Sequence, residues 1–170
     1  MTISIDPNST MQQALDNIKI TKDKLDKKKQ EFRNTEIALA KEFQPQFELV
    51  FKDFFQHVPQ IKTISWTQYT PYFMDGDTCY FSIHEIFALN FVPEYPQEYY
   101  EEEDLEEGQF AYDSYSMREA SDLSDEQKTL CNQIFNLINS NGDFLEEIYG
   151  DHTSVTATAQ GIDTDDYEHD

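Results

Sequence analysis

Residues 8–44 contain neither glycine nor proline, and within them an apolar residue recurs at every seventh position. The recurring residues are Met11, Ile18, Leu25, Phe32 and Leu39, with Leu15 and Phe43 at the alternate seam position. This spacing is typical of a helix with one narrow apolar stripe, and Asn8, Ser9 and Thr10 offer N-caps for it. We therefore expect a helical arm over residues 1–44, whose helix after the caps is about 50 Å long at ~1.5 Å per residue.

The remaining seam positions of the arm are charged, namely Lys22, Lys29 and Glu36. A helix with so little apolar surface is marginal in water on its own. The arm therefore lies on its own domain, docks on a partner, or pairs with a second copy in a homodimer. The last alternative makes Met11, Ile18, Leu25, Phe32 and Leu39 the self-association residues. Lysines of this stretch are interleaved with acids, which favours a solvated mixed-charge face over a nucleic-acid patch.

The formal net charge of −22 lies entirely after residue 60, where 3 Lys/Arg stand against 25 Asp/Glu. A field of this sign repels nucleic acid, anionic lipid and acidic substrates, and it attracts basic protein surfaces. The 13 Phe and 10 Tyr argue for a folded domain, because disordered acidic chains are poor in aromatics. The expected partner is thus a basic protein that itself binds nucleic acid, with no direct nucleic-acid or membrane contact.

Patterns after the arm predict an acidic α+β domain over residues 45–170. Pro45 begins a new helical turn or kinks the long helix, and the phenylalanines that follow it are core candidates. From Ile61 the apolar period is two, which predicts a β-hairpin over residues 62–89 with a loop at Asp75–Asp77. Ser124-x-x-Gln127 is a capping box that opens a helix ending at Asn141-Gly142, and a shorter helix follows.

A second hairpin is predicted in the tail, with a turn at Gln160-Gly161. It extends the first hairpin into one small antiparallel sheet of about four strands, packed with helices. The fold class expected is therefore α+β with a long N-terminal helical arm.

An acidic aromatic loop is expected over residues 93–125, where carboxylates alternate with tyrosines. One hypothesis is that its acids occupy a nucleic-acid groove of a partner, while tyrosines act as anchors of the kind enriched at interfaces. The alternative is an acidic loop whose aromatic side chains cover the domain. The partner-binding residues of the first hypothesis are acids of the loop and the last hairpin, together with three tyrosines: Glu101, Glu102, Glu103, Asp104, Glu106, Glu107, Asp163, Asp165, Asp166, Tyr99, Tyr100 and Tyr112.

The sequence contains no recognisable catalytic frame, that is, no phosphate loop, His-Glu-x-x-His, Cys-x-x-Cys or nucleophile elbow. His152 and His169 could meet across the last hairpin as a zinc or hydrolase site, but a plain surface pair is the expected reading. Asp75-Gly76-Asp77 matches only two positions of a calcium loop. We expect no catalytic residue, no metal and no cofactor.

The two cysteines and the N-terminus indicate the cellular compartment of the protein. Cys79 and Cys131 are expected to be reduced thiols, although a disulfide is open if the fold brings them together. The N-terminus has no basic region followed by an apolar one, and no run of 18 apolar residues follows it. These features predict a cytoplasmic protein.

Two strings of the sequence resemble a family of uncharacterised proteins from large tailed bacteriophages. They are Trp66-Thr67-Gln68-Tyr69-Thr70-Pro71-Tyr72-Phe73-Met74-Asp75-Gly76-Asp77-Thr78-Cys79, and Tyr149-Gly150-Asp151-His152 with the ending Tyr167-Glu168-His169-Asp170. The family has no assigned activity, so the resemblance carries over no catalytic residue. It implies expression in the cytoplasm of an infected bacterium, where small acidic phage proteins often block host machinery.

The functional hypothesis that follows is a non-catalytic phage protein that inhibits a host protein through an acidic surface. Nucleic-acid mimicry against a defence nuclease, CRISPR effector or polymerase is its sharpest form. The alternatives are an inhibitor of another host protein, such as a cytosolic protease contacted by the arm, and an oligomeric structural or assembly protein.

Overall fold

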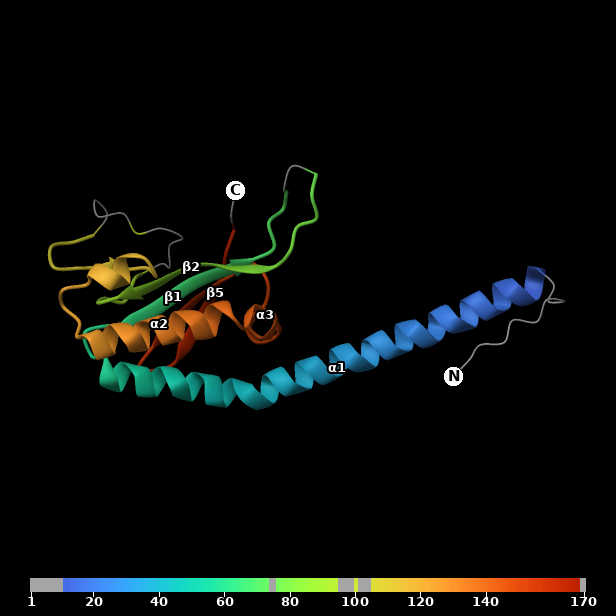
Figure 1. Ribbon diagram of the computed structural model, residues 1–170, viewed down its shortest axis with the longest axis horizontal. Coiled ribbons are helices and arrows are strands. Elements are labelled where there is room, and N and C mark those ends of the chain that lie inside the picture. Colours follow the sequence, from blue (N-terminus) through green and yellow to red (C-terminus); the bar gives the residue numbers. More distant parts are fainter. Residues whose placement is uncertain (1–10, 74–75, 95–99, 101–104, 169–170) are drawn as a thin grey trace. The chain divides into compact units, whose positions relative to one another are not determined.

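The computed structural model describes residues 11–73, 76–94, 100 and 105–168 (Figure 1). Contacts within the chain divide it into two compact units, Met1–Leu39 and Ala40–Asp170. This division falls inside helix α1, Met11–His57, near the boundary at residues 44 and 45 that the sequence predicts. Helices and an antiparallel sheet together confirm the predicted α+β class.

Helix α1 continues through Pro45 without interruption. Proline in a helix interior costs about 3 kcal/mol, because it removes a hydrogen bond and crowds the preceding turn. The four phenylalanines after Pro45, at positions 47, 51, 54 and 55, are buried, and each contributes about 1.5–3 kcal/mol. Burial of this face therefore offsets the proline, so neither a new helix nor a separate turn begins there.

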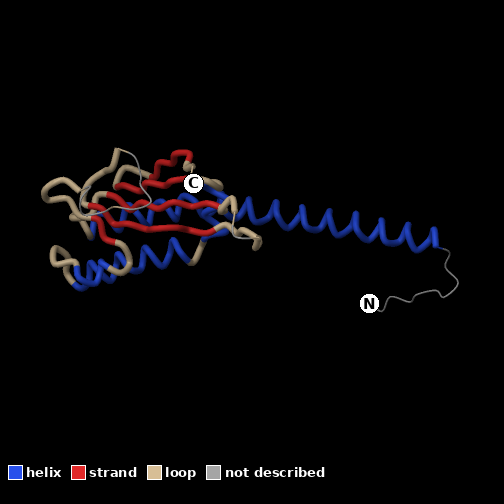
Figure 2. The backbone as a smooth tube through the Cα atoms, turned by 90° about the horizontal axis from the view of Figure 1, so that it is seen from above, coloured by secondary structure: helices blue, strands red, loops and turns tan. Residues whose placement is uncertain are grey.

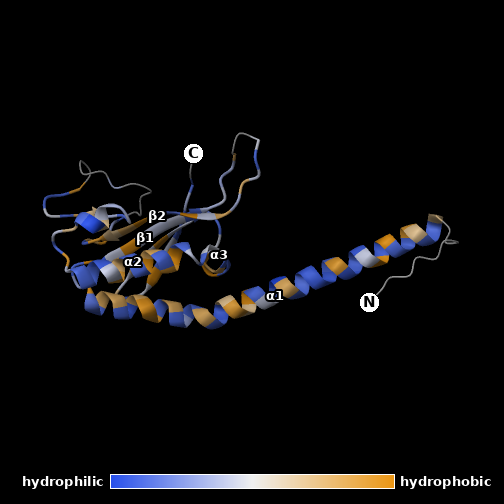
Figure 3. Cartoon of the chain, viewed as in Figure 1, coloured by the Kyte–Doolittle hydropathy of each residue, from blue (hydrophilic) through white to orange (hydrophobic). Residues whose placement is uncertain are grey.

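Within the first unit, the described side chains of α1 are exposed except for the half-buried Ala14 and Ile37. Apolar and polar residues alternate along the helix (Figure 3). Gln12 and Gln30 donate to the side chains four residues later, Asp16 and Asn34, at 3.0 Å each. Such pairs contribute only a few tenths of a kcal/mol each, so they do not replace a packed apolar face.

The second unit is built on a five-stranded antiparallel sheet of order β3-β2-β1-β4-β5 (Figure 2). The strands are β1 Thr63–Tyr69, β2 Ser82–Leu89, β3 Ala111–Tyr112, β4 Thr153–Thr158 and β5 Ile162–Asp166. Both predicted hairpins are present, and pairing of β1 with β4 joins them. The prediction of about four strands missed β3, which has two residues inside the predicted acidic loop.

A β-bulge interrupts the β1–β2 ladder. Ser65 pairs with Phe87 and Thr67 with His84, so β2 carries one extra residue, and Glu85 there has φ of +22°. Because side chains alternate between faces, the extra residue moves His84 and Ser82 off the helix-covered face. Both then point to the same side of the sheet as Thr67 and Tyr69.

The other face of the sheet packs against α2 Asp125–Asn139, α3 Gly142–Tyr149 and the second-unit part of α1 (Figure 1). Trp66 lies at the centre of this core and stacks on Phe51, with ring centroids 6.1 Å apart. The predicted capping box is present: the Ser124 side chain accepts from the Gln127 backbone, and the Gln127 side chain accepts from the Ser124 backbone. A one-turn 3-10 helix, Ser116–Glu119, packs against α2.

Candidate functional site

The two strings that carry the phage resemblance meet in the structure. Residues 66–72, which are the end of β1 and the three residues after it, lie against residues 149–152, which are the end of α3 and the turn before β4, and we call this contact the junction. Trp66 and Tyr149 form an edge-on ring pair at 6.1 Å. The backbone N–H of Thr70 donates to Asp151 Oδ1 at 2.7 Å. Segments about eighty residues apart in sequence therefore form one local structure.

Gln68 connects the junction to the core. Its side chain is fully buried, accepts from Trp66 Nε1 at 3.0 Å, and donates to the carbonyl oxygens of Leu145 and Gly150 at 3.2 and 2.5 Å. These bonds connect β1 to one carbonyl oxygen within α3 and one just after it. The role of Gln68 is therefore structural.

The turn at residues 150–152 requires two left-handed backbone conformations. Gly150 has φ of +92° and His152 has φ of +53°. Glycine adopts this region freely, whereas a residue with a Cβ does so at a cost. Asp151 holds the turn, because its Oδ1 also accepts the backbone N–H of His152 at 2.8 Å.

The electrostatics of the junction centre on Asp151. Partial burial by itself raises the pKa of this carboxyl, but hydrogen bonds from Thr70 and His152 and the nearby His152 ring outweigh it and lower the pKa. The imidazole Nε2 of His152 lies 3.8 Å from Asp151 Oδ2. The carboxylate is therefore held in its charged form at neutral pH.

Aromatic rings cluster on the face of the sheet opposite the helices. Tyr69 stacks on His84 at 3.8 Å and lies 5.5 Å from the Tyr167 ring. Tyr72 stacks on His152 at 4.7 Å and keeps 68% of its surface exposed. Sequence reasoning did not select these residues as a site. The available signal was the alternation of aromatic and histidine positions along the two predicted hairpins.

The Ser82 hydroxyl lies 2.8 Å from His84 Nε2. A hydroxyl beside an imidazole is one half of an activated serine nucleophile; the other half is a carboxylate that orients the imidazole, with donors for an oxyanion. Asp151 lies beside the His152 ring, with its Oδ2 3.8 Å from Nε2. The stacked rings of Tyr69 with His84 and of Tyr72 with His152 form an aromatic surface on this face.

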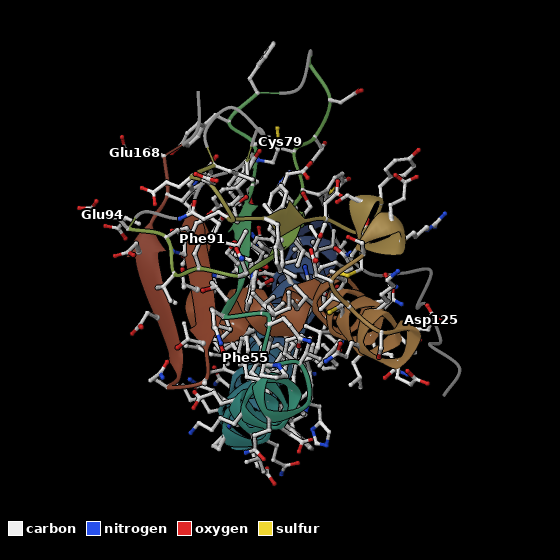
Figure 4. The ribbon with its side chains drawn as sticks, turned by 90° about the vertical axis from the view of Figure 1, so that its left-hand side faces the viewer. Phe55, Cys79, Phe91, Glu94, Asp125 and Glu168 are labelled. Carbon is white, nitrogen blue, oxygen red and sulfur yellow. The ribbon has the colours of Figure 1, made fainter. Side chains whose placement is uncertain are left out.

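Strand β5 forms one edge of the sheet and carries three of the predicted acidic residues. Asp163, Asp165 and Asp166 are exposed, and pairing with β4 aligns Asp163 with Thr156 and Asp165 with Ser154. Tyr167 follows β5 directly, and its backbone donates to the His152 carbonyl at 2.8 Å. Figure 4 shows Glu168 on this outer side of the sheet. The acidic edge and the aromatic junction are therefore adjacent.

The other predicted acids lie elsewhere or outside the described residues. Glu101, Glu102, Glu103 and Asp104 are outside the described residues, and so is Tyr99. Glu106 and Glu107 are exposed beside β3 at the opposite edge of the sheet. Four strand spacings of about 4.8 Å separate these edges, roughly 19 Å, so the structure does not gather Glu106 and Glu107 with the β5 aspartates.

Tyr100 and Tyr112 pack on their own domain. The Tyr100 ring contacts Phe87 and Phe91 at centroid distances of 5.0 and 6.0 Å. Tyr112 lies 4.7 Å from the Phe110 ring and donates its hydroxyl to Asp122 at 3.3 Å. These two rings therefore cover the domain, which is the alternative that the sequence left open for the loop aromatics.

In the part of the chain that the structure describes, no group of three or more His, Cys, Asp or Glu is placed to hold a metal. The His152–His169 pair is only half described, because His169 lies outside the described residues. Both cysteines are free. Burial raises the pKa of the Cys131 thiol to about 12, so it is a poor nucleophile at neutral pH.

Comparisons with protein-family models, with curated proteins and with solved structures find no match for this chain. The resemblance to phage proteins stays a prediction. Among the described helices, none is long and apolar enough to cross a membrane.

Proposed function

We propose that this chain is a non-catalytic binding protein that inhibits a positively charged protein by covering its binding surface. Strand β5 and the junction supply the contact. The observation that carries the proposal is the exposed Tyr72 ring stacked on His152, on a sheet whose neighbouring edge is lined by aspartates. An aromatic anchor surrounded by charged residues is the usual composition of an energetic centre in protein interfaces.

Charge supports a basic partner. Residues 40–170 carry 5 Lys/Arg against 28 Asp/Glu, a net charge of −23. Such a surface accelerates association with positive partners and slows association with negative ones. A basic groove that normally holds nucleic acid carries the complementary charge.

The spacing of β5 supports mimicry of nucleic acid. Residues two apart on a strand lie about 6.8 Å from each other, so Asp163 and Asp165 form a short row on one face. The row carries negative charges at a regular spacing, as the phosphate backbone of a nucleic acid does.

The resemblance to phage proteins implies that the inhibited protein belongs to an infected bacterial host. A cytoplasmic location fits the two free cysteines, since thiols persist in a reducing compartment. The target in this proposal is a defence nuclease, CRISPR effector or polymerase of the host.

The test is capture from bacterial lysate on immobilised protein, followed by competition with a 30-base-pair DNA duplex. Wild type should retain a basic nucleic-acid-binding protein that the duplex displaces. Retention should weaken steeply with salt, because the screening length falls from about 10 Å at 0.1 M to about 3 Å at 1 M. Asp163→Lys with Asp165→Lys should lose the partner, and Tyr72→Ala should weaken retention at least tenfold.

A matched control reverses the same number of charges elsewhere, with Asp77→Lys and Glu119→Lys at two exposed positions. This control should retain the partner. A stable ternary complex with the duplex, or full retention by the β5 variant, contradicts the proposal.

A further inference from the structure

Helix α1 exposes an apolar stripe of seven side chains, and we propose that a second copy of the chain covers it in an antiparallel pair. The stripe consists of Met11, Leu15, Ile18, Leu25, Phe32, Leu39 and Phe43, each with about half or more of its surface exposed. This inference does not depend on the acidic edge or on its partner.

The area fits a specific interface. Seven side chains in each of two copies, at roughly 100 Å² apiece, bury on the order of 1,400 Å², within the range of about 1,200–2,000 Å² for stable complexes.

Charges between the stripe residues argue against a parallel pair. In a parallel, in-register dimer each seam residue meets its own counterpart. Lys22 would face Lys22, Lys29 would face Lys29, and Glu36 would face Glu36, so three seam layers would hold like charges. Like-charge juxtaposition disfavours an arrangement.

An antiparallel alignment removes all three clashes. In the alignment that sets Ile18 against Phe43 of the second copy, each charged seam residue meets an apolar one: Lys22 meets Leu39, Lys29 meets Phe32, and Glu36 meets Leu25. Long charged side chains cover apolar neighbours with their methylene stems and keep the charge in water.

The exposed apolar stripe and the charges on its seam thus select the same partner, a second copy of this chain.

The test uses single-cysteine variants of the full chain, Lys22→Cys and Leu39→Cys, each in a Cys79→Ser background. Cys131 is buried and stays unreactive. When the two variants are mixed and oxidised, the antiparallel pair should give the mixed 22–39 disulfide and no homodisulfide. Lys27→Cys, on the opposite side of the helix, is the control and should give no crosslink with either.

Light scattering supplies a second measurement. The wild-type mass should be twice the 20.0 kDa of one chain, and Leu25→Ser with Phe32→Ser should halve it while the circular dichroism of the β-rich unit is unchanged. Homodisulfides at 22 and 39 would show a parallel pair and overturn the proposal. A monomeric wild type at 100 µM would overturn it as well.

Discussion

Asp151 shows how one residue holds the junction. A single oxygen, Oδ1, accepts backbone hydrogen bonds from Thr70 and His152, and so ties the end of β1 to the turn before β4. Because both bonds reach the same oxygen, an asparagine can keep the geometry and lose only the charge. The position therefore allows a clean test of how much the charge contributes.

Asp151→Asn should lower the free energy of unfolding by about 1 kcal/mol at pH 7, the low end for charged hydrogen bonds because the group is partly exposed. The folded pKa of Asp151 lies below its ordinary value of 3.8. Its contribution is therefore complete above that value and is lost as pH falls through the lower folded pKa. Urea unfolding at pH 7 and pH 3 should show the difference shrinking. Asp77→Asn should show no difference, and a variant effect that is constant with pH would contradict the account.

At the residue scale, the sequence predicted which residues form strands better than it predicted their burial. Alternation marked residues 63–69 as a strand with one buried face, yet all seven residues are buried. Thr63, Ser65 and Thr67 are covered on the second face, where Phe91 accepts a hydrogen bond from Thr63 and the Tyr100 ring packs on Phe87. Burial by residues that are distant in the sequence leaves no pattern in the strand's own residues.

Helix α2 shows how a local signal specifies an element and its neighbour. The Ser124–Gln127 capping box satisfies backbone donors at the start of the helix. The Gln127 amide nitrogen also donates to the His57 carbonyl at 3.2 Å and to Gln60 at 2.9 Å. The cap therefore also connects α2 to the end of α1.

Ser124→Ala should destabilise the protein by about 1 kcal/mol, since it removes a cap acceptor. The measurement is the urea midpoint at an unchanged m-value, as expected when stability alone changes. Ser124→Asp keeps an acceptor and should restore most of the loss. Equal stability of the alanine variant and wild type would show that Gln127 holds the helix start without the serine.

At the element scale, caps and turns made both hairpins and both short helices predictable. β3 and the β2 bulge were not predictable, because two residues are too few for a period and a bulge depends on the partner strand. Pro45 shows the same limit. Its local effect is to break a helix, and only burial of the following phenylalanines explains why α1 continues.

At the scale of the whole molecule, charge distinguishes the two units. Residues 1–39 carry 7 Lys/Arg against 6 Asp/Glu, while the second unit has a net charge of −23. The sequence placed the change of charge at residue 60 and predicted a boundary at residues 44 and 45, and it selected the aspartates at 163, 165 and 166 as partner-binding residues. It did not predict the junction. The two strings are about eighty residues apart in the sequence, and they meet only because β1 and β4 are neighbours in the sheet.

The most direct test of the proposed contact is hydrogen–deuterium exchange of the protein, alone and bound to its captured partner. The account predicts slower exchange at residues 162–168, 70–73 and 151–152 on binding, with residues 11–39 unchanged between free and bound protein. Slower exchange confined to residues 11–39, with β5 and the junction unaffected, would contradict it and assign partner binding to the arm.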